Sequence, residues 1–163
     1  MSARVMSGLR ALAFALAIAV ALPGTAAAGR IFKTYGDVMS YALPLTALAV
    51  TLAHGDGEGL AEFSAAMLFA DSATRGLKRV VRRERPDGSD RLSFPSGHAT
   101  RAFAAAAYLD RRYGRAFGFP AYMLAWTVGA SRVDARAHHW SDVMGAAAIT
   151  TFIVYLAAHG EDR

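Results

Sequence analysis

The chain has 163 residues, of which 54% are hydrophobic and 19% are charged, and its formal net charge is +5. This length fits one domain, and the basic balance fits an anionic substrate or an anionic membrane surface without choosing between them. The absence of cysteine excludes a cysteine-dependent phosphatase mechanism and a thiolate metal site.

Residues 1–28 have the features of an export signal. Two arginines precede an apolar run from Ala11 to Leu22, and three alanines that end at Ala28 offer small residues for cleavage. We therefore expect a signal peptide over residues 1–28 and one mature domain over residues 29–163, with an uncleaved first membrane helix as the alternative. Cleavage would remove two arginines and no acidic residue, which lowers the net charge from +5 to +3.

Apolar residues with helical periodicity recur through the rest of the chain, without the alternation typical of strands. We expect helices over roughly residues 38–53, 60–77, 98–113, 117–131 and 141–158. The predicted fold is an all-α helical bundle of about five mature helices, or six counting the N-terminal segment.

The first basic cluster lies at the end of the second of these helices. Lys78 and Arg85 stand seven residues apart, close to two helical turns, so we expect both to project from one helix face. Pro86 cannot continue a helix, so the helix is predicted to end around Arg85. Cations are also favoured at any helix C-terminus, so this cluster alone does not assign a function.

The second cluster is the run from Pro95 to His98, just before an alanine-rich helix. Ser96 is a candidate N-cap, and Gly97 would let the backbone approach a ligand closely. The first-turn amides would then form an anion site, and His98 could donate a proton to a leaving oxygen. The alternative is an ordinary helix start with an exposed histidine.

The third cluster contains Ser131, Arg132, His138 and Asp142. His138 and Asp142 are four residues apart and would share a helix face, so the carboxylate could orient and charge-stabilise a histidine nucleophile. His139 is a rival, because a spacing of three also allows contact with Asp142. The planar guanidinium of Arg132 suits bidentate binding of phosphate oxygens. Surface pairing of histidine and aspartate is the alternative reading.

The order and spacing of the three clusters resemble the signature of the type-2 phosphatidic-acid phosphatase and vanadium haloperoxidase superfamily. The signature reads Lys-x6-Arg-Pro, then Pro-Ser-Gly-His, then Ser-Arg-x5-His-x3-Asp. In this chain its parts are Lys78–Pro86, Pro95–His98 and Ser131–Asp142, and every signature position matches. The resemblance implies an acid-phosphatase/haloperoxidase-like helical fold, and its spacing selects His138 over His139.

The resemblance also implies a role for each matching residue. His138 would be the nucleophile that forms a phosphohistidine, Asp142 would orient it, and His98 would protonate the leaving oxygen and then activate water. The residues that would bind the phosphate oxygens are Lys78, Arg85, Ser96, Gly97 and Arg132. Such preorganised donors meet the charge that develops in the transition state.

The implied function is a metal-independent phosphatase for a lipid-linked or small phosphate monoester or diphosphate. The sequence has no Asp/Glu cluster with metal-ligand spacing, so we expect no metal or other cofactor, with vanadate acting only as a phosphate analogue. One alternative is a vanadate-dependent haloperoxidase-like oxidase, although known members of that class are far longer. The other alternative is a non-catalytic anion-binding helical protein.

The expected location follows from helix length and charge. The predicted helices are short for membrane spans, which need ~17–25 residues. The basic run from Arg75 to Arg85 would also contradict the positive-inside preference if the site faced the periplasm. We therefore expect an exported, periplasmic, membrane-associated domain, with an integral inner-membrane protein as the close alternative. The expected partners are a phosphorylated, lipid-linked substrate and a membrane surface or bilayer. Nucleic acid is not expected, and no oligomeric state is predicted.

Overall fold

The computed structural model describes residues 25–159, which form five α-helices and no strand. The helices are α2 (Thr25–Ala53), α3 (Gly57–Val81), α4 (Gly97–Tyr113), α5 (Arg115–Asp134) and α6 (Trp140–His159). The predicted all-α bundle is therefore confirmed. Residues 1–24, which contain most of the predicted signal peptide, lie outside the described residues, and α2 begins at Thr25, ahead of the predicted junction at residue 28.

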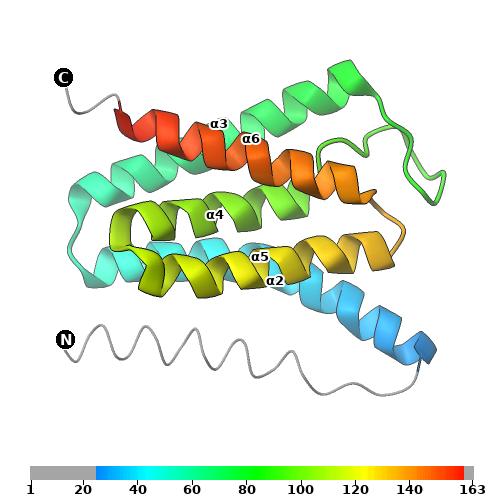
Figure 1. The fold of residues 1–163 in the computed structure, drawn as a ribbon, viewed down its shortest axis with the longest axis horizontal. Coiled ribbons are helices and arrows are strands. Elements are labelled where there is room, and N and C mark those ends of the chain that lie inside the picture. The colour runs from blue at the N-terminus through cyan, green and yellow to red at the C-terminus, as the bar shows by residue number, and fades with distance from the viewer. Residues whose placement is uncertain (1–24, 160–163) are drawn as a thin grey trace.

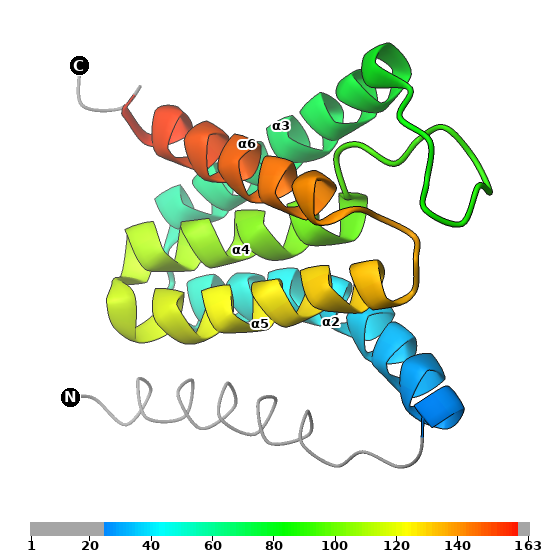
Figure 2. The same ribbon diagram turned by 45° about the vertical axis from the view of Figure 1, so that its right-hand side comes forward.

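Helix α4 forms the centre of the bundle and contacts each of the four other described helices (Figures 1 and 2). Its residues 102–109 are all buried, and five of these eight are alanines. Small side chains allow neighbouring helices to approach closely, while Phe103 and Tyr108 fill the larger spaces. The alanine-rich sequence of α4 thus suits a helix surrounded by others.

The bundle has two ends with different contents (Figure 1). At the right-hand end in that view, α3 and α5 finish, α4 and α6 begin, and residues 82–96 form a loop. We call this the site end. At the opposite end, which we call the far end, short turns join α2 to α3 and α4 to α5.

Helix α3 ends between the end of the predicted apolar range at residue 77 and the stop expected around Arg85. Its last residue is Val81, and Arg82 adopts the left-handed conformation (φ 48°) while its N–H bonds the carbonyl of Lys78. This is a common helix C-terminal arrangement, although glycine is its usual residue. The expectation that Lys78 and Arg85 share one helix face is therefore wrong, because Arg85 lies in the loop.

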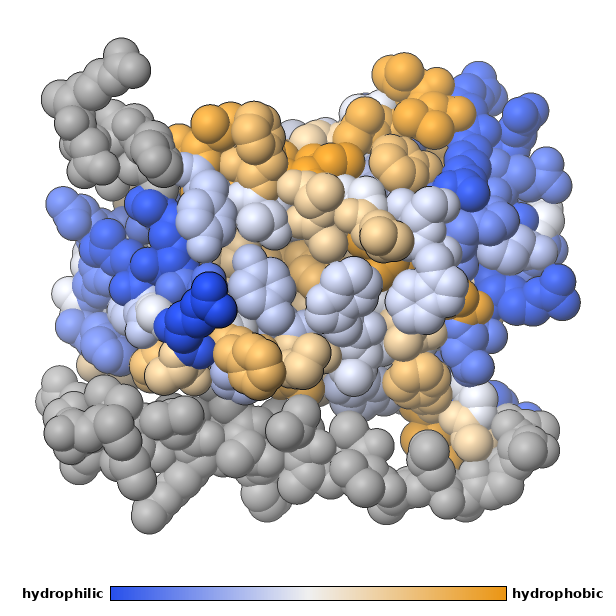
Figure 3. Space-filling model, viewed as in Figure 1, coloured by the Kyte–Doolittle hydropathy of each residue, from blue (hydrophilic) through white to orange (hydrophobic). Residues whose placement is uncertain are grey.

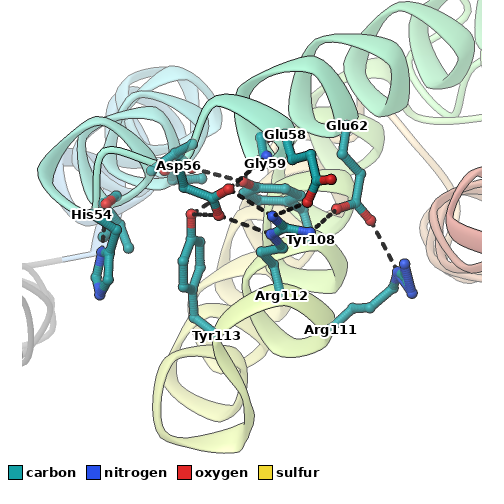
Figure 4. A network of polar contacts seen from close by, with 12 residues as sticks. His54, Asp56, Glu58, Gly59, Glu62, Tyr108, Arg111, Arg112 and Tyr113 are labelled. Carbon is teal, nitrogen blue, oxygen red and sulfur yellow. Dashed lines mark hydrogen bonds and ion pairs between the residues drawn. The ribbon is translucent and has the colours of Figure 1, made fainter. Parts of the chain in front are cut away.

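A network of ion pairs and hydrogen bonds joins α3 to α4 at the far end (Figure 4). Asp56 caps α3 by accepting from the Gly59 N–H, and its two carboxylate oxygens accept from Nη2 and Nε of Arg112 at 2.6 and 2.8 Å. The Tyr113 hydroxyl donates to the same carboxylate at 2.9 Å. The buried Glu62 pairs with Arg111 and Arg112. These contacts join the start of α3 to the end of α4.

On the face that Figure 3 shows, apolar and weakly polar side chains lie between the two polar ends. We use the name apolar belt for the large hydrophobic residues exposed on the helices between residues 38 and 156, apart from Val80, Val81 and Trp140 near the site end. Its members are Val38, Tyr41, Leu45 and Leu52 of α2, Leu60, Leu68 and Phe69 of α3, Phe119, Met123 and Trp126 of α5, and Met144, Phe152, Tyr155 and Leu156 of α6. Among the described residues, one stretch, Ala27–Ala53, is long and apolar enough to cross a membrane by length and composition.

Candidate active site

The three sequence clusters converge at the site end. The first comes from the last turn of α3 and the following loop, the second from the start of α4, and the third from the last turn of α5 and the connection to α6. A backbone hydrogen bond from Ser96 N to Asp142 O (3.1 Å) joins the second cluster to the third. Arg85 Nη1 donates to the carbonyl of Ala137 at 3.0 Å, which joins the first cluster to the third.

His138 and Asp142 are brought together by a helix start and not by a shared helix face. Helix α6 begins at Trp140, so His138 lies in the preceding connection. Asp142, in the first turn, accepts from the backbone N–H of His139 through Oδ2 at 2.8 Å. This reach back to the residue before the helix resembles a capping box. The expectation that both residues sit on one helix is therefore wrong, although the two side chains do face each other.

Two side chains that the sequence analysis did not single out hold the Asp142 carboxylate. Arg83 Nη1 donates to Oδ1 at 2.8 Å, and the Ser93 hydroxyl donates to Oδ2 at 2.5 Å. The carboxylate is fully buried. A buried carboxylate needs such partners, since an unpaired charge away from water is costly. Asp142 is consequently held in place behind His138.

The His138 imidazole is buried, with 3% of its side chain exposed. Nδ1 lies 3.7 Å from Oδ2 of Asp142 and has no hydrogen-bond partner among the described residues. Nε2 lies 3.3 Å from Nη1 of Arg85. Burial, followed by the charges of Arg85 and Lys78, lowers the pKa of His138 to about 4. The ring is therefore neutral at neutral pH, with Nε2 turned toward a cation.

The rival histidine has a different environment. The His139 ring is half-buried, and its Nε2 lies 3.3 Å from the carbonyl of Glu84. Only the backbone N–H of His139 contacts the Asp142 carboxylate. The structure thus brings the His138 ring, and not the His139 ring, next to Asp142 and Arg85.

Lys78 and Arg85 are both held by loop residues 90–92. The Lys78 ammonium donates to the carbonyl of Leu92, and Nε of Arg85 donates to Asp90 Oδ1 at 2.7 Å. Burial, and then the charge of Arg85, lowers the pKa of Lys78 to about 8. The loop therefore gathers two cations beside the His138 ring, even though only Lys78 is on a helix.

Ser96 and Gly97 start α4 as the sequence predicts. Ser96 is the N-cap, and its hydroxyl accepts from the Ala99 N–H at 3.5 Å. A Cβ added at Gly97 would have no neighbour within 4 Å, so this first helical residue borders open space. The positive end of the α4 dipole is therefore accessible to an anion at Gly97.

His98 and Arg132 meet at a carboxylate that the sequence analysis did not identify. Oδ1 of Asp37, on α2, accepts from Nη1 of Arg132 at 2.5 Å and lies 3.1 Å from Nε2 of His98. Burial, and then the charges of Arg132 and Arg101, lowers the pKa of His98 to about 4. Asp37 lies just ahead of the first predicted mature helix, with no motif around it to indicate a role.

The site end is therefore rich in cations and backbone donors and holds a neutral His138 imidazole, an inventory suited to a tetrahedral oxyanion. Within the described part of the chain, no group of three or more His, Cys, Asp or Glu residues is arranged to hold a metal ion.

Comparison with curated proteins gives relatives whose names all describe phosphatases. Lipid A 4'-phosphatase of Helicobacter pylori is 34% identical over 120 residues, which cover 66% of this chain and 60% of that protein. Decaprenylphosphoryl-5-phosphoribose phosphatase of Mycolicibacterium smegmatis is 31% identical over 132 residues, covering 75% of this chain and 71% of that protein. Lipid A 1-phosphatase of Porphyromonas gingivalis is 32% identical over 129 residues, covering 72% of this chain and 29% of that protein.

Among solved structures, a transmembrane PAP2-type phosphatidylglycerolphosphate phosphatase from Bacillus subtilis aligns with a TM-score of 0.48 at 20% identity, covering 99% of this chain and 97% of that one. The sequence also matches the model of the PAP2 superfamily over residues 59–163. That match includes all three clusters and more than half of the chain, so this protein belongs to the PAP2 superfamily.

Proposed function

We propose that this protein is a metal-independent phosphatase that hydrolyses a lipid-linked phosphate monoester or diphosphate through a phosphohistidine at His138. The observation that carries this proposal is the pairing of a buried, neutral His138 with the fixed carboxylate of Asp142 behind it and Arg85 in front of it. A neutral imidazole has a lone pair for attack, and the carboxylate stabilises the positive charge that attack creates.

The proposed reaction has two steps. Nε2 of His138 forms a bond to phosphorus while the bond from phosphorus to the leaving oxygen breaks, and His98 supplies the proton that this oxygen gains. A water molecule then gives its proton to His98 and attacks phosphorus, which breaks the P–N bond and releases phosphate. The donors proposed to hold the phosphate oxygens are Lys78, Arg85, Ser96, Gly97 and Arg132.

The lipid-linked substrate is supported by two independent observations. The curated relatives are named for lipid A and for a decaprenyl-linked phosphoribose, so each name describes a phosphate joined to a lipid. The apolar belt also extends to Met144 of α6, and Trp140 at the start of the same helix is exposed as well; both are at least half exposed and lie two residues from Asp142 in the sequence. A lipid-linked substrate could thus keep its lipid part in an apolar phase while its phosphate lies at the site end.

The belt also supports insertion into a membrane over peripheral attachment. Soluble monomeric proteins rarely expose contiguous apolar patches beyond a few hundred Å². Here large hydrophobic side chains are exposed on four of the five described helices. On α3 the charged pair Asp71–Arg75 interrupts the belt, so the apolar part of that helix lies mainly before Asp71. We propose an integral or deeply embedded protein with both polar ends outside the apolar phase.

The test is phosphate release by the purified, detergent-solubilised protein from p-nitrophenyl phosphate and from phosphatidate, with EDTA present. We expect EDTA-resistant release by the wild type and a loss of at least about a thousandfold in His138→Ala, since covalent catalysis and its charge stabilisation both disappear. His139→Ala is the matched control, because its ring faces Glu84 and not Asp142. Activity retained in His138→Ala, or abolished by EDTA, would overturn the proposal.

A further inference from the structure

Helix α2 contributes a carboxylate to the site although it lies outside both the signature and the PAP2 superfamily match, which begins at residue 59. One oxygen of Asp37, Oδ1, contacts both Nη1 of Arg132 (2.5 Å) and Nε2 of His98 (3.1 Å). These two residues come from α5 and α4, so Asp37 is the point where three helices meet at the site.

The Arg132 side chain packs closely against α2 at Gly36. The Arg132 side chain is 3% exposed, and its Nη2 donates to the carbonyl of Lys33. A Cβ at Gly36 would lie 1.8 Å from the Ser131 hydroxyl oxygen and 2.6 Å from Nη2 of Arg132, so only glycine allows this approach. Nε of Arg132 donates to the Ser131 hydroxyl at 3.1 Å. Each guanidinium nitrogen thus has a partner, and two of the three partners belong to α2.

Burial of the guanidinium makes its carboxylate partner necessary. An unpaired cation away from water is strongly unfavourable, and a fixed carboxylate both neutralises it and sets its orientation. Asp37 itself is half exposed, so it borders the space that a ligand would occupy. Its contact with His98 places the imidazole at a set distance from the same guanidinium.

We propose that Asp37 is a positioning residue for the phosphatase reaction, holding the His98 imidazole and the Arg132 guanidinium in a fixed relation to one phosphate. This inference rests on the proposed function. It assigns α2 a part in leaving-group protonation, because a proton donor is effective only when its nitrogen faces the departing oxygen.

The charges around His98 give Asp37 a second effect. Arg132 on α5 and Arg101 on α4, together with burial, lower the pKa of His98, while Asp37 on α2 acts in the opposite direction. Removing the carboxylate leaves two cations acting on the ring without opposition from α2. The protonated form of His98, which the first step needs, then becomes scarcer at any given pH.

The test compares phenyl phosphate with p-nitrophenyl phosphate, two esters of similar size that differ in how strongly the leaving oxygen needs a proton. The parameter is kcat/KM, because it reports the steps up to loss of the leaving group. In Asp37→Asn we expect kcat/KM for phenyl phosphate to fall about tenfold or more further than that for p-nitrophenyl phosphate. The basic limb of the phenyl phosphate pH profile is expected to move to lower pH.

Asp71→Asn is the matched control, since it makes the same chemical change in an exposed ion pair on α3. If Asp37→Asn does not fold, Asp37→Glu serves instead, because it moves the charge by one methylene and is expected to show the same selective loss. An equal loss for both esters would indicate only a structural role and would overturn the inference. An unchanged ratio of the two kcat/KM values, together with tighter inhibition by inorganic phosphate, would also overturn it, because Asp37 would then be a competitor for Arg132. An inactive wild type or an active His138→Ala would instead contradict the proposed function.

Discussion

The two cations beside His138 act on that residue, and we propose that they also bind the phosphate. Together with burial they lower the pKa of the His138 imidazole to about 4, which keeps it neutral and nucleophilic at neutral pH. Their own positive charges face the region where negative charge would develop on phosphate. In the proposed reaction, a single arrangement of Lys78 and Arg85 would therefore serve both the nucleophile and the oxyanion.

Lys78 is expected to set an upper pH limit on anion binding. Burial and Arg85 lower the pKa of its ammonium to about 8. As the pH rises through this value, the unliganded protein loses the Lys78 charge, so inhibition by inorganic phosphate should weaken about fivefold between pH 8 and 9. In Lys78→Arg the guanidinium stays charged throughout this range, and the decline should disappear. The measurement is the inhibition constant of phosphate against pH, and an identical decline in both proteins would contradict the assignment.

The signature residues could be predicted from the sequence because their spacing is itself a sequence property. Their partners could not, since they come from distant segments. Arg83 and Ser93 reach Asp142 across 59 and 49 positions of the chain, and Asp37 reaches Arg132 across 95. No local pattern marks an arginine, a serine or an aspartate for such a contact. Sequence reasoning thus identified the groups expected to touch phosphate, and the structure adds the side chains that hold them.

At the scale of elements, helical periodicity predicted the existence of the helices better than their ends. Helix α4 agrees with its predicted range to within one residue, because Ser96 and Gly114 are recognisable cap residues. Helix α3 ends before Arg85 because Arg82 takes a left-handed conformation that is unusual for arginine. Helix α2 begins at Thr25, well before the predicted start at residue 38. Apolar periodicity did not reveal these first turns because they are not strongly apolar.

The far-end network joins two elements, α3 and α4, through Asp56 and Arg112. Asp56→Asn keeps a side chain able to cap α3 but removes the charge that Arg112 contacts. We expect this change to lower the free energy of unfolding by about 1.5–3 kcal/mol, the range for a hydrogen bond to a charged group. Thermal unfolding in detergent would measure it. Glu58→Gln is the control, because Glu58 is largely exposed 3.3 Å from the same arginine and should contribute little.

The contribution of Asp56 is also expected to depend on pH. The hydrogen bonds from Arg112 hold the pKa of the Asp56 carboxyl well below its usual value near 4. A group with a lowered folded-state pKa stabilises the fold above its unfolded pKa, and this stabilisation is lost as the pH falls toward the folded value. The difference in the free energy of unfolding between wild type and Asp56→Asn should therefore have its full value at pH 7 and shrink below about pH 4. A difference that grows on acidification would contradict the ion pair.

At the scale of the whole molecule, polarity is divided along the long axis. The site end and the far end carry the charged networks, and the apolar belt lies between them (Figure 3). The sequence analysis favoured a membrane-associated domain over an integral one on the basis of short helices. The described α2 and α3 have 29 and 25 residues, or ~44 and ~38 Å at 1.5 Å per residue, against a hydrocarbon thickness of ~30 Å. The longer helices remove the main objection to insertion.

A charge placed in the belt should therefore act through the membrane and not through the fold. Leu45 is 63% exposed on α2, so a polar residue there would replace little buried surface. In water, Leu45→Asp should be nearly neutral, whereas at the centre of a bilayer an aspartate costs about 2.5–3.5 kcal/mol. We expect the wild type to stay in the membrane pellet after carbonate extraction, and Leu45→Asp to be depleted from that pellet.

The control is Ala116→Asp, which adds the same charge at the exposed start of α5 in the far end. It should behave as the wild type does, since an acidic residue in a first helical turn is favourable. Release of the wild type by carbonate, or equal depletion of both variants, would place the belt outside the bilayer.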